Sequence, residues 1–251
     1  MNLAAALERI DVAQLSEEES VQLALACMAV EKEEERQKWQ NLFPDEGPFR
    51  RELYPKHMEH FRAGATCRER LFIAANRVGK TVAGASEASF HLTGRYPDWW
   101  EGRRFDRPID AWAAGDTNET TRDIIQKQLL GSIDYSSGQR AFDGVGTIPW
   151  ECHGKPVFKI NTNGLLDNIE IQHISGGWSN LAFKSYEQGR KVFQGTAKHV
   201  IWLDEEGPMD VYNECLIRTT TTGGIVLLTF TPLLGMSDVV RAFIQGDRAN
   251  A

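Results

Sequence analysis

Short apolar runs alternate with stretches of helical character along most of the chain. Runs that are bounded by turn residues, or that alternate with a period of two, indicate strands at residues 71–75, 109–115, 156–160, 169–174, 180–185, 200–203 and 225–230. Helices are expected from residue 82 and at residues 119–130, 210–219 and 238–245, the second of them capped by Thr117 or Asn118. Residues 131–155 are rich in glycine and are predicted to be irregular. Strands that alternate with helices favour a mostly parallel sheet covered on both faces.

Residues 1–46 are predicted to form a small helical appendage. A capping box begins at Ser16, and the apolar residues from Val21 to Val30 are followed by a polar and charged stretch at residues 31–40. The apolar half requires a packing partner, whereas the charged half suits either a solvated helix face or a surface that docks a partner. The turn-rich segment at residues 44–48 separates this appendage from a main domain at residues 47–251.

The composition is that of an ordinary globular protein, with 251 residues, 41% hydrophobic and 25% charged. No apolar run approaches the roughly 20 residues of a membrane-spanning helix. The four cysteines are widely spaced and form no Cys-x-x-Cys pair, which favours a reduced intracellular setting. A net charge of −7 excludes a protein that coats nucleic acid by bulk charge, so any DNA contact requires a local patch. Arg103, Arg104 and Arg107 are candidates for that patch, with a solvated loop as the alternative.

Two histidines, His57 and His60, stand three residues apart. No third ligand with suitable spacing lies nearby, so we expect solvated or packed histidines rather than a metal site.

The stretch around Gly79, Lys80 and Thr81 has the features of a phosphate-binding loop. It follows an apolar run and precedes small residues that suit a tightly packed helix. Backbone amides at such a helix N-terminus point at an anion, Lys80 would reach the β- and γ-phosphates, and the Thr81 hydroxyl would ligate Mg²⁺. Ala74 stands where the pattern G-x-x-x-x-G-K-[ST] has its first glycine, so the match is partial and an ordinary loop lysine is the alternative.

A second motif follows more than a hundred residues later, where the apolar run 200–203 ends in Asp204 and Glu205. This is a Walker B arrangement, in which Asp204 would support Mg²⁺ and Glu205 would orient the attacking water and accept its proton. Adjacent acids after a strand are common at protein surfaces. The preceding phosphate loop is what makes the functional interpretation stronger.

A third motif is the run 225–230 with its terminal hydroxyl groups and Pro232. Ligands of open α/β sheets bind at the carboxyl ends of the strands. Thr229 or Thr231 could therefore sense the presence of a γ-phosphate, and an ordinary strand end is the alternative.

Together these motifs resemble the ATPase domain of large terminase subunits, the DNA-packaging motors of tailed bacteriophages. The resemblance extends from about Tyr54 to Ala242 and rests on residues 74–81, 188–196, 203–206 and 229–232. It implies an α/β P-loop NTPase fold of the ASCE type, with ATP and Mg²⁺ as cofactors. The implied function is ATP hydrolysis that drives double-stranded DNA into a procapsid.

The resemblance also implies roles for individual residues. Tyr54 corresponds to an aromatic residue that stacks on adenine, although a merely packed tyrosine is the alternative, and Thr229 and Thr231 belong to a coupling motif. An arginine is expected at the γ-phosphate, either Arg77 in cis or Arg190 in trans from a neighbouring subunit. We favour Arg190 for the trans role because Gln194 stands where some family members carry that arginine. The residues implied to bind ATP in the loop are Asn76, Arg77, Val78, Gly79, Lys80 and Thr81.

The implied partners are double-stranded DNA, the portal protein and procapsid, the small terminase subunit and further copies of this chain in a ring. The host cell cytoplasm is the expected location, without a membrane. The chain ends at Ala251, just past the coupling motif, so we expect an ATPase domain without the family's nuclease domain or nuclease activity. Two other functions stay open: a helicase-like DNA translocase, and a nucleotide-gated assembly module.

Overall fold

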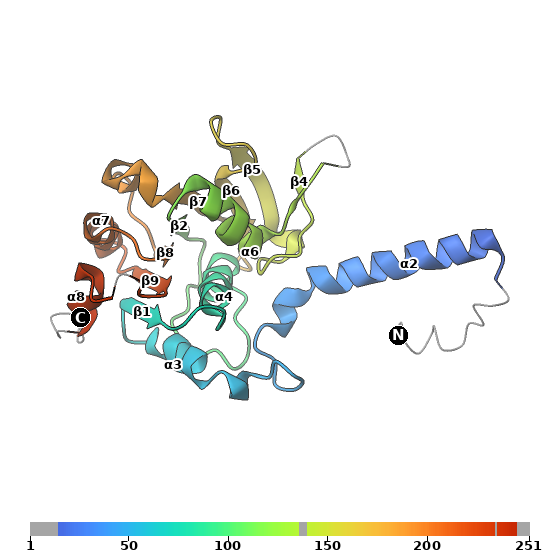
Figure 1. Ribbon diagram of the computed structural model, residues 1–251, viewed down its shortest axis with the longest axis horizontal. Helices are drawn as coiled ribbons and strands as arrows, with labels where there is room; N and C mark the ends of the chain where they lie inside the picture. Colours follow the sequence, from blue (N-terminus) through green and yellow to red (C-terminus); the bar gives the residue numbers. More distant parts are fainter. Residues whose placement is uncertain (1–14, 136–139, 234, 245–251) are drawn as a thin grey trace.

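The computed structural model describes residues 15–135, 140–233 and 235–244 (Figure 1). Seven strands form the main sheet, and the five at one side of it run parallel to one another. The last two strands pair antiparallel at the other side. The predicted mostly parallel sheet is confirmed. In spatial order the strands are β1 (Glu69–Ile73), β9 (Ile225–Phe230), β8 (Val200–Asp204), β2 (Asp110–Gly115), β7 (Trp178–Ser185), β6 (Leu166–Gln172) and β5 (His153–Phe158).

Helices connect the strands and cover the sheet (Figure 1). The predicted helix at 119–130 begins after Thr117, whose hydroxyl accepts from the Thr120 amide, and its middle part, Thr121–Gln126, is π-helical. Short 3₁₀ turns occupy Lys38–Asn41, Arg51–Leu53, Trp150–Cys152, Tyr186–Gln188 and Arg190–Phe193. The α-helices are α2 (Glu17–Arg36), α3 (Pro55–Ala63), α4 (Lys80–Thr93), α5 (Asn118–Thr120), α6 (Lys127–Leu130), α7 (Met209–Thr220) and α8 (Asp238–Ile244).

The central strand β2 shows how the sheet separates two hydrophobic layers. Ala111 and Ala113 point into a core that they share with α4, whereas Trp112 and Ala114 point into a core that they share with α7. Successive side chains of a strand point to opposite faces, so an apolar run without polar positions is buried on both sides. This is why β8 and β9 are buried along their whole length.

Helix α4 lies unusually close to the sheet because its residues are small. Gly84 faces the indole ring of Trp202 on β8, and a Cβ atom built on Gly84 would lie 2.3 Å from the indole Nε1. Nearly every residue of α4 from Ala83 onward is buried. Since α4 begins at Lys80, this contact also fixes where the preceding loop meets the edge of the sheet.

A buried ion pair joins α4 to β1, the strand that precedes the loop. Arg70 of β1 donates to the carboxylate of Glu87 on α4, with Nη1 3.0 Å from Oε2, and Glu87 is fully buried. Burial opposes ionisation, but Arg70 and the hydrogen bond to His91 outweigh it and lower the pKa of Glu87 to about 2. The strand before the loop and the helix after it are therefore joined by charge as well as by packing.

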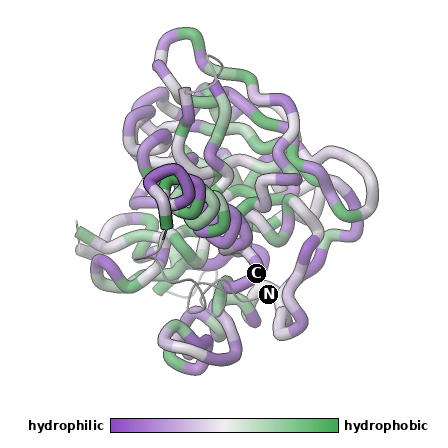
Figure 2. Tube along the Cα trace, turned by 90° about the vertical axis from the view of Figure 1, so that its right-hand side faces the viewer, coloured by the Kyte–Doolittle hydropathy of each residue, from purple (hydrophilic) through white to green (hydrophobic). Residues whose placement is uncertain are grey.

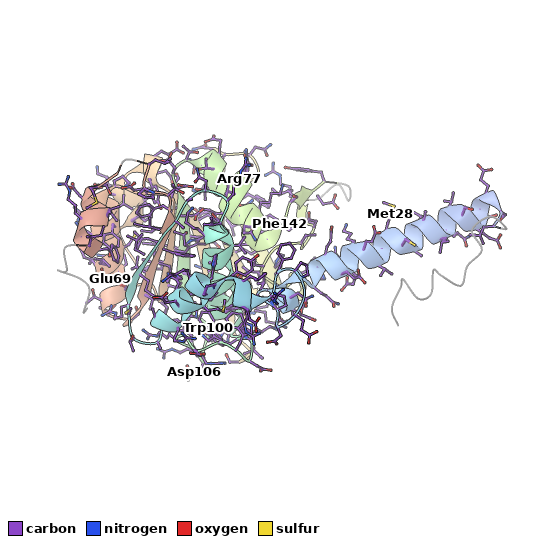
Figure 3. All side chains as sticks on the ribbon, turned by 60° about the horizontal axis from the view of Figure 1, so that its bottom comes forward. Met28, Glu69, Arg77, Trp100, Asp106 and Phe142 are labelled. Carbon is purple, nitrogen blue, oxygen red and sulfur yellow. The ribbon has the colours of Figure 1, made fainter. Side chains whose placement is uncertain are left out.

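Helix α2 projects from the domain, and none of its residues is buried (Figure 1). Val21, Leu25 and Met28 are 55%, 61% and 65% exposed, and Figure 3 shows Met28 on the free part of the helix. Figure 2 views α2 nearly end-on, with hydrophobic and hydrophilic turns following one another along it. Among the described residues of this chain the apolar half of α2 meets no core, because the helix extends away from both cores. That it packs on a partner stays a prediction.

The base of α2 is held by Arg36, whose Nε donates to the Asp143 carbonyl at 2.8 Å and whose guanidinium lies 4.8 Å from the Trp150 ring centroid. Beyond it, Leu42 and Phe43 are buried in a third hydrophobic cluster, together with residues of α3 and β1. The predicted limit of the appendage at residue 46 therefore falls after the first residues of the packed domain, because Phe43 fills that cluster.

The segment 131–155 is more regular than predicted. β3 (Ile133–Asp134) and β4 (Ala141–Phe142) form an antiparallel pair, and β5 already begins at His153. None of the described helices combines the length and hydropathy that crossing a bilayer requires.

Two arginines of the candidate basic patch, Arg103 and Arg104, contact other residues of the domain. Arg103 lies 4.9 Å from the Phe105 ring centroid and donates to the Gly223 carbonyl. Arg104 lies 5.0 Å from the ring centroid of Tyr96. Both guanidinium groups are stacked on aromatic rings, which a freely solvated loop would not require.

We expect Gly84→Ala to destabilise the protein by about 1–3 kcal/mol, because the added methyl group would overlap the Trp202 indole. Urea denaturation measures the change in the free energy of unfolding. Gln22→Ala, on the exposed α2, is the control and should stay within about 0.5 kcal/mol of wild type. A Gly84→Ala protein more stable than wild type, as in an open helix, would contradict this packing.

The buried His60 predicts a loss of stability in mild acid. Its ring stacks on Phe72 at 5.1 Å, and burial, with the positive charge of Arg70, lowers the pKa of His60 to about 4. An unfolded histidine titrates near 6.5, so between pH 6.5 and 4 the unfolded chain binds the extra proton and the free energy of unfolding falls as pH falls.

His60→Phe should reduce the difference in stability between pH 7.5 and pH 5 by about 2 kcal/mol while preserving the stacking on Phe72. Urea denaturation at both pH values measures this. His153, whose burial lowers its pKa to about 4, keeps part of the slope in both proteins. An unchanged slope would show that folding does not shift the pKa of His60.

Candidate nucleotide-binding site

The loop at residues 74–79 joins β1 to the N-terminus of α4. Gly79 precedes the first residue of the helix with a φ of 85°, and Arg77 has a φ of 64°. Figure 3 labels Arg77 on this loop, where its side chain is exposed. Left-handed residues let the chain turn sharply from strand to helix. The amides of the first turn of α4 are then available to an anion.

The ammonium group of Lys80 lies at the centre of this loop, and the side chain is 8% exposed. Nζ donates to the Ala75 carbonyl at 2.8 Å and to Thr231 Oγ1 at 2.9 Å. Thr231 in turn donates to Asn76 Oδ1 at 2.6 Å. The end of β9 and the loop after β1 are thus joined through one cation and one hydroxyl, which brings Lys80, Thr231 and Asn76 together.

The carboxylate of Asp204, at the end of β8, meets the start of α4. Thr81 Oγ1 donates to its two oxygens at 3.1 and 3.2 Å, and Thr229 Oγ1 donates to Oδ1 at 2.6 Å. Thr229 is itself held by the indole of Trp202, whose Nε1 donates to Oγ1 at 2.7 Å. The structure therefore brings together the threonine of the loop, the aspartate and the first threonine of the third motif.

Burial raises the pKa of Asp204 to about 7, although the hydrogen bonds from Thr229 and Thr81 oppose the rise. A buried carboxylate that is held by hydroxyl groups gains from a cation beside it. Among the described residues no group of three His, Cys, Asp or Glu side chains could hold a metal. Mg²⁺ at phosphate sites keeps waters and takes one or two protein ligands, so the Thr81 hydroxyl and the Asp204 carboxylate fit that ion.

Glu205 follows with an exposed side chain and a φ of 68°. Its amide donates to the Thr229 carbonyl at 3.0 Å, and the Tyr186 hydroxyl donates to the carbonyls of Asp204 and Glu205 at 3.0 and 3.2 Å. A left-handed non-glycine residue costs energy and persists only when its surroundings hold it. Here the hydrogen bonds from Tyr186 and to the Thr229 carbonyl hold the turn, and the Glu205 side chain is left exposed.

The first turn of α3 contacts the phosphate loop through the side chain of His57. His57 is buried, and its ring forms hydrogen bonds with the backbone of Val78 and Gly79, although burial is the larger influence and lowers its pKa. Tyr54 lies edge-on to His57, with 5.3 Å between ring centroids, and is partly buried. The expectation of a packed histidine is confirmed. Its contact with the phosphate loop was missed because nothing in the local pattern indicates it.

Arg190 is turned away from this group of residues. Its Nε and Nη2 lie 2.9 and 2.8 Å from Oε2 of Glu214 on α7, a carboxylate that also pairs with Arg218. Of the two predicted arginines, Arg77 therefore lies on the phosphate loop, and Arg190 is paired with α7.

A family model described as terminase large subunit, T4likevirus-type, N-terminal, matches residues 71–251. The chain belongs to the terminase large subunit family. It is 37% identical over 252 residues to the terminase large subunit of Salmonella phage P22, covering 92% of this chain and 47% of that protein. It is 25% identical over 142 residues to the terminase large subunit of Enterobacteria phage LP7, covering 55% of this chain and 28% of that protein. The chain thus spans about half the length of the P22 relative, and the predicted family is confirmed.

Solved structures of this family are also similar. The HK97 bacteriophage large terminase matches with a TM-score of 0.49 and 14% identity, covering 82% of this chain and 38% of that one. The large terminase of a thermophilic bacteriophage, in complex with ADP, matches with a TM-score of 0.41 and 12% identity, covering 82% of this chain and 43% of that one.

We expect Thr229→Val to cost about 1–3 kcal/mol of stability, because it leaves the buried Trp202 N–H without its acceptor. Thr229→Ser retains the hydroxyl and should recover most of the loss. The control Thr196→Val, at an exposed position, should stay within about 0.5 kcal/mol of wild type. Urea denaturation at pH 7.5 compares the three variants, and a Thr229→Val protein as stable as wild type would contradict the hydrogen-bond chain.

Proposed function

We propose that this chain is the ATPase domain of a viral DNA-packaging motor, which hydrolyses ATP with Mg²⁺ to move double-stranded DNA into a procapsid. The observation that carries the proposal is the contact between Thr81 and Asp204, which are 123 residues apart in sequence and lie 3.1 Å apart at the side chain. Membership of the terminase large subunit family supports the same function.

The phosphates bind, in this proposal, at the N-terminus of α4. Lys80 exchanges its hydrogen bonds with Ala75 and Thr231 for phosphate oxygens, which are stronger acceptors because they are charged. The amides after Gly79 contribute the remaining donors. Since Thr231 then loses its bond from Lys80, it is placed to register whether a phosphate is present, which is the role proposed for the coupling motif.

The Thr81 hydroxyl and the Asp204 carboxylate would hold Mg²⁺. When bound, the ion supplies charge neutralisation at the phosphate oxygens. The Thr229 hydroxyl keeps the Asp204 carboxylate oriented toward Thr81. Ordering the carboxylate in advance lowers the cost of forming the site.

Glu205 is proposed to position the attacking water and accept its proton. Its carboxylate is exposed and follows Asp204 directly, so it is free to act where Asp204 is occupied. Arg77 is proposed to stabilise the developing charge in cis. Arg190 can do so in trans only after it leaves Glu214, a contact that a neighbouring subunit would have to compete with.

The wider setting is part of the same proposal. A trans-acting Arg190 requires a ring of subunits, and packaging requires the portal, the procapsid and the small terminase subunit, in the host cell cytoplasm. A helicase-like translocase would separate strands without a capsid. A nucleotide-gated assembly module would need no water activator such as Glu205.

We expect Glu205→Gln to retain ATP binding and to lower turnover by about 10²–10⁴-fold, since the amide cannot accept a proton. Lys80→Ala should lose nucleotide binding as well. Phosphate release and nucleotide titration measure the two properties. Glu206→Gln is the matched control, because the Glu206 carboxylate oxygens are shielded from solvent and its turnover should match wild type. Undiminished turnover of Glu205→Gln would remove Glu205 from the mechanism.

A further inference from the structure

The hydroxyl group of Tyr186 lies beside the turn that carries Glu205, and three backbone carbonyls surround it. Its oxygen is 3.0 Å from the Asp204 carbonyl, 3.2 Å from the Glu205 carbonyl and 3.4 Å from the Ala114 carbonyl on β2. Tyr186 itself is 5% exposed. A phenol has one proton to donate, so this proton is shared mainly between the two nearer carbonyls. The end of β8 is thus held by a residue that lies outside that strand.

The turn has to be held because Glu205 has a φ of 68°. A non-glycine residue in the left-handed region is strained, and it stays there only when its surroundings oppose relaxation. The Glu205 amide donates to the Thr229 carbonyl at 3.0 Å, and the Glu205 carbonyl accepts from Tyr186. The side chain leaves the backbone between these two groups. Together, the two hydrogen bonds therefore set the direction of the Glu205 Cα–Cβ bond.

The phenol ring is itself fixed by its surroundings. Phe193 packs against it with 6.4 Å between ring centroids, and a Cβ atom built on Gly207 would lie 3.0 Å from a ring carbon. The next residue, Glu187, is joined to the segment that follows β2. Its amide donates to the Asp116 carbonyl at 3.0 Å, and its carboxylate accepts from the Asn118 amide at 2.7 Å. A ring held by packing and through its neighbour is a rigid donor, which the precise placement of a catalytic group requires.

We infer that Tyr186 is a positioning residue, whose hydroxyl keeps the Glu205 carboxylate directed at the attacking water. This inference rests on the proposed ATPase function, in which Glu205 accepts the proton of that water. Burial raises the pKa of the Tyr186 hydroxyl well above its ordinary value, so the hydroxyl keeps its proton near neutral pH. The Asp204 carboxylate has donors of its own in Thr81 and Thr229. Loss of the phenol hydroxyl should therefore slow hydrolysis and leave nucleotide binding nearly unchanged.

The test compares Tyr186→Phe with wild type, using the full chain with Mg²⁺. Phenylalanine keeps the packing of the ring and removes only the donor. Phosphate release should give a kcat about 10–100-fold lower, with KM and the calorimetric affinity for ATP within about twofold of wild type. Tyr212→Phe is the matched control, because Tyr212 is 1% exposed and its hydroxyl donates to Glu69, at the end of β1 opposite to the phosphate loop. This control should keep the wild-type turnover.

A double-mutant comparison separates positioning from a general structural effect. If Tyr186 acts through Glu205, Tyr186→Phe should lower the turnover of Glu205→Gln by less than about twofold, because the residual reaction no longer depends on that carboxylate. Single-turnover hydrolysis of radiolabelled ATP measures rates of this size. Thermal unfolding of each variant checks that it is folded.

Two results would overturn the inference and leave the proposed function standing. One is a Tyr186→Phe protein that hydrolyses ATP like wild type while Glu205→Gln does not. The other is an equal loss of turnover in the wild-type and Glu205→Gln backgrounds, or a parallel loss of ATP affinity, since the hydroxyl would then serve the fold and not the position of Glu205. If wild type does not hydrolyse ATP, the proposed function fails and the inference with it.

Discussion

The site depends on one buried carboxylate that has hydroxyl groups for partners. Asp204 ends a strand that is buried on both faces, and Thr81 and Thr229 donate to it from α4 and β9. Because burial raises its pKa to about 7, the carboxylate is costly to keep charged until a cation lies beside it. A cation bound at the end of β8 would therefore be stabilised by this carboxylate. The hydrogen bonds of the carboxylate also join β8 to α4 and β9, so binding would act on all three elements.

The packing of α4 against the sheet also helps to position Asp204. Gly84 lets the helix approach Trp202, and the Trp202 indole then donates to Thr229, which donates to Asp204. A single small residue in the core is thus linked through two hydrogen bonds to the carboxylate. A larger residue at position 84 would displace the helix whose first turn carries Lys80 and Thr81. The packing of the core therefore also determines the geometry of the site.

The segment before α3 lines a cavity beside the phosphate loop. Phe43 is buried against α3 and β1, and the cavity it lines reaches Gly79 on the phosphate loop. Because this segment continues directly from α2, the projecting helix and this cavity share one short connection, residues 37–43. Left-handed residues mark both sides of the site, at Phe43, Arg77 and Glu205. Phe43 is held by packing and Glu205 by hydrogen bonds, as strained residues must be.

Local pattern was sufficient for the seven strands of the main sheet and for the order of the motifs. The runs at residues 200–203 and 225–230 are apolar throughout, so burial on both faces follows from the sequence, and the acids and hydroxyls after them had to lie at one edge of a parallel sheet. The sequence alone therefore predicts that Lys80, Thr81, Asp204 and Glu205 lie together.

Only the tertiary structure decided which long-range partners those residues have. The contact of His57 with the phosphate loop, the pairing of Arg190 with Glu214 and the hydrogen bonds of Tyr186 to the carbonyls at the end of β8 join elements distant in sequence. Likewise, the apolar turns of α2 predict burial, yet the direction in which the chain leaves the domain after Arg36 keeps them exposed. Periodicity reports which face of an element is apolar, whereas the identity of its neighbour depends on the path of the whole chain.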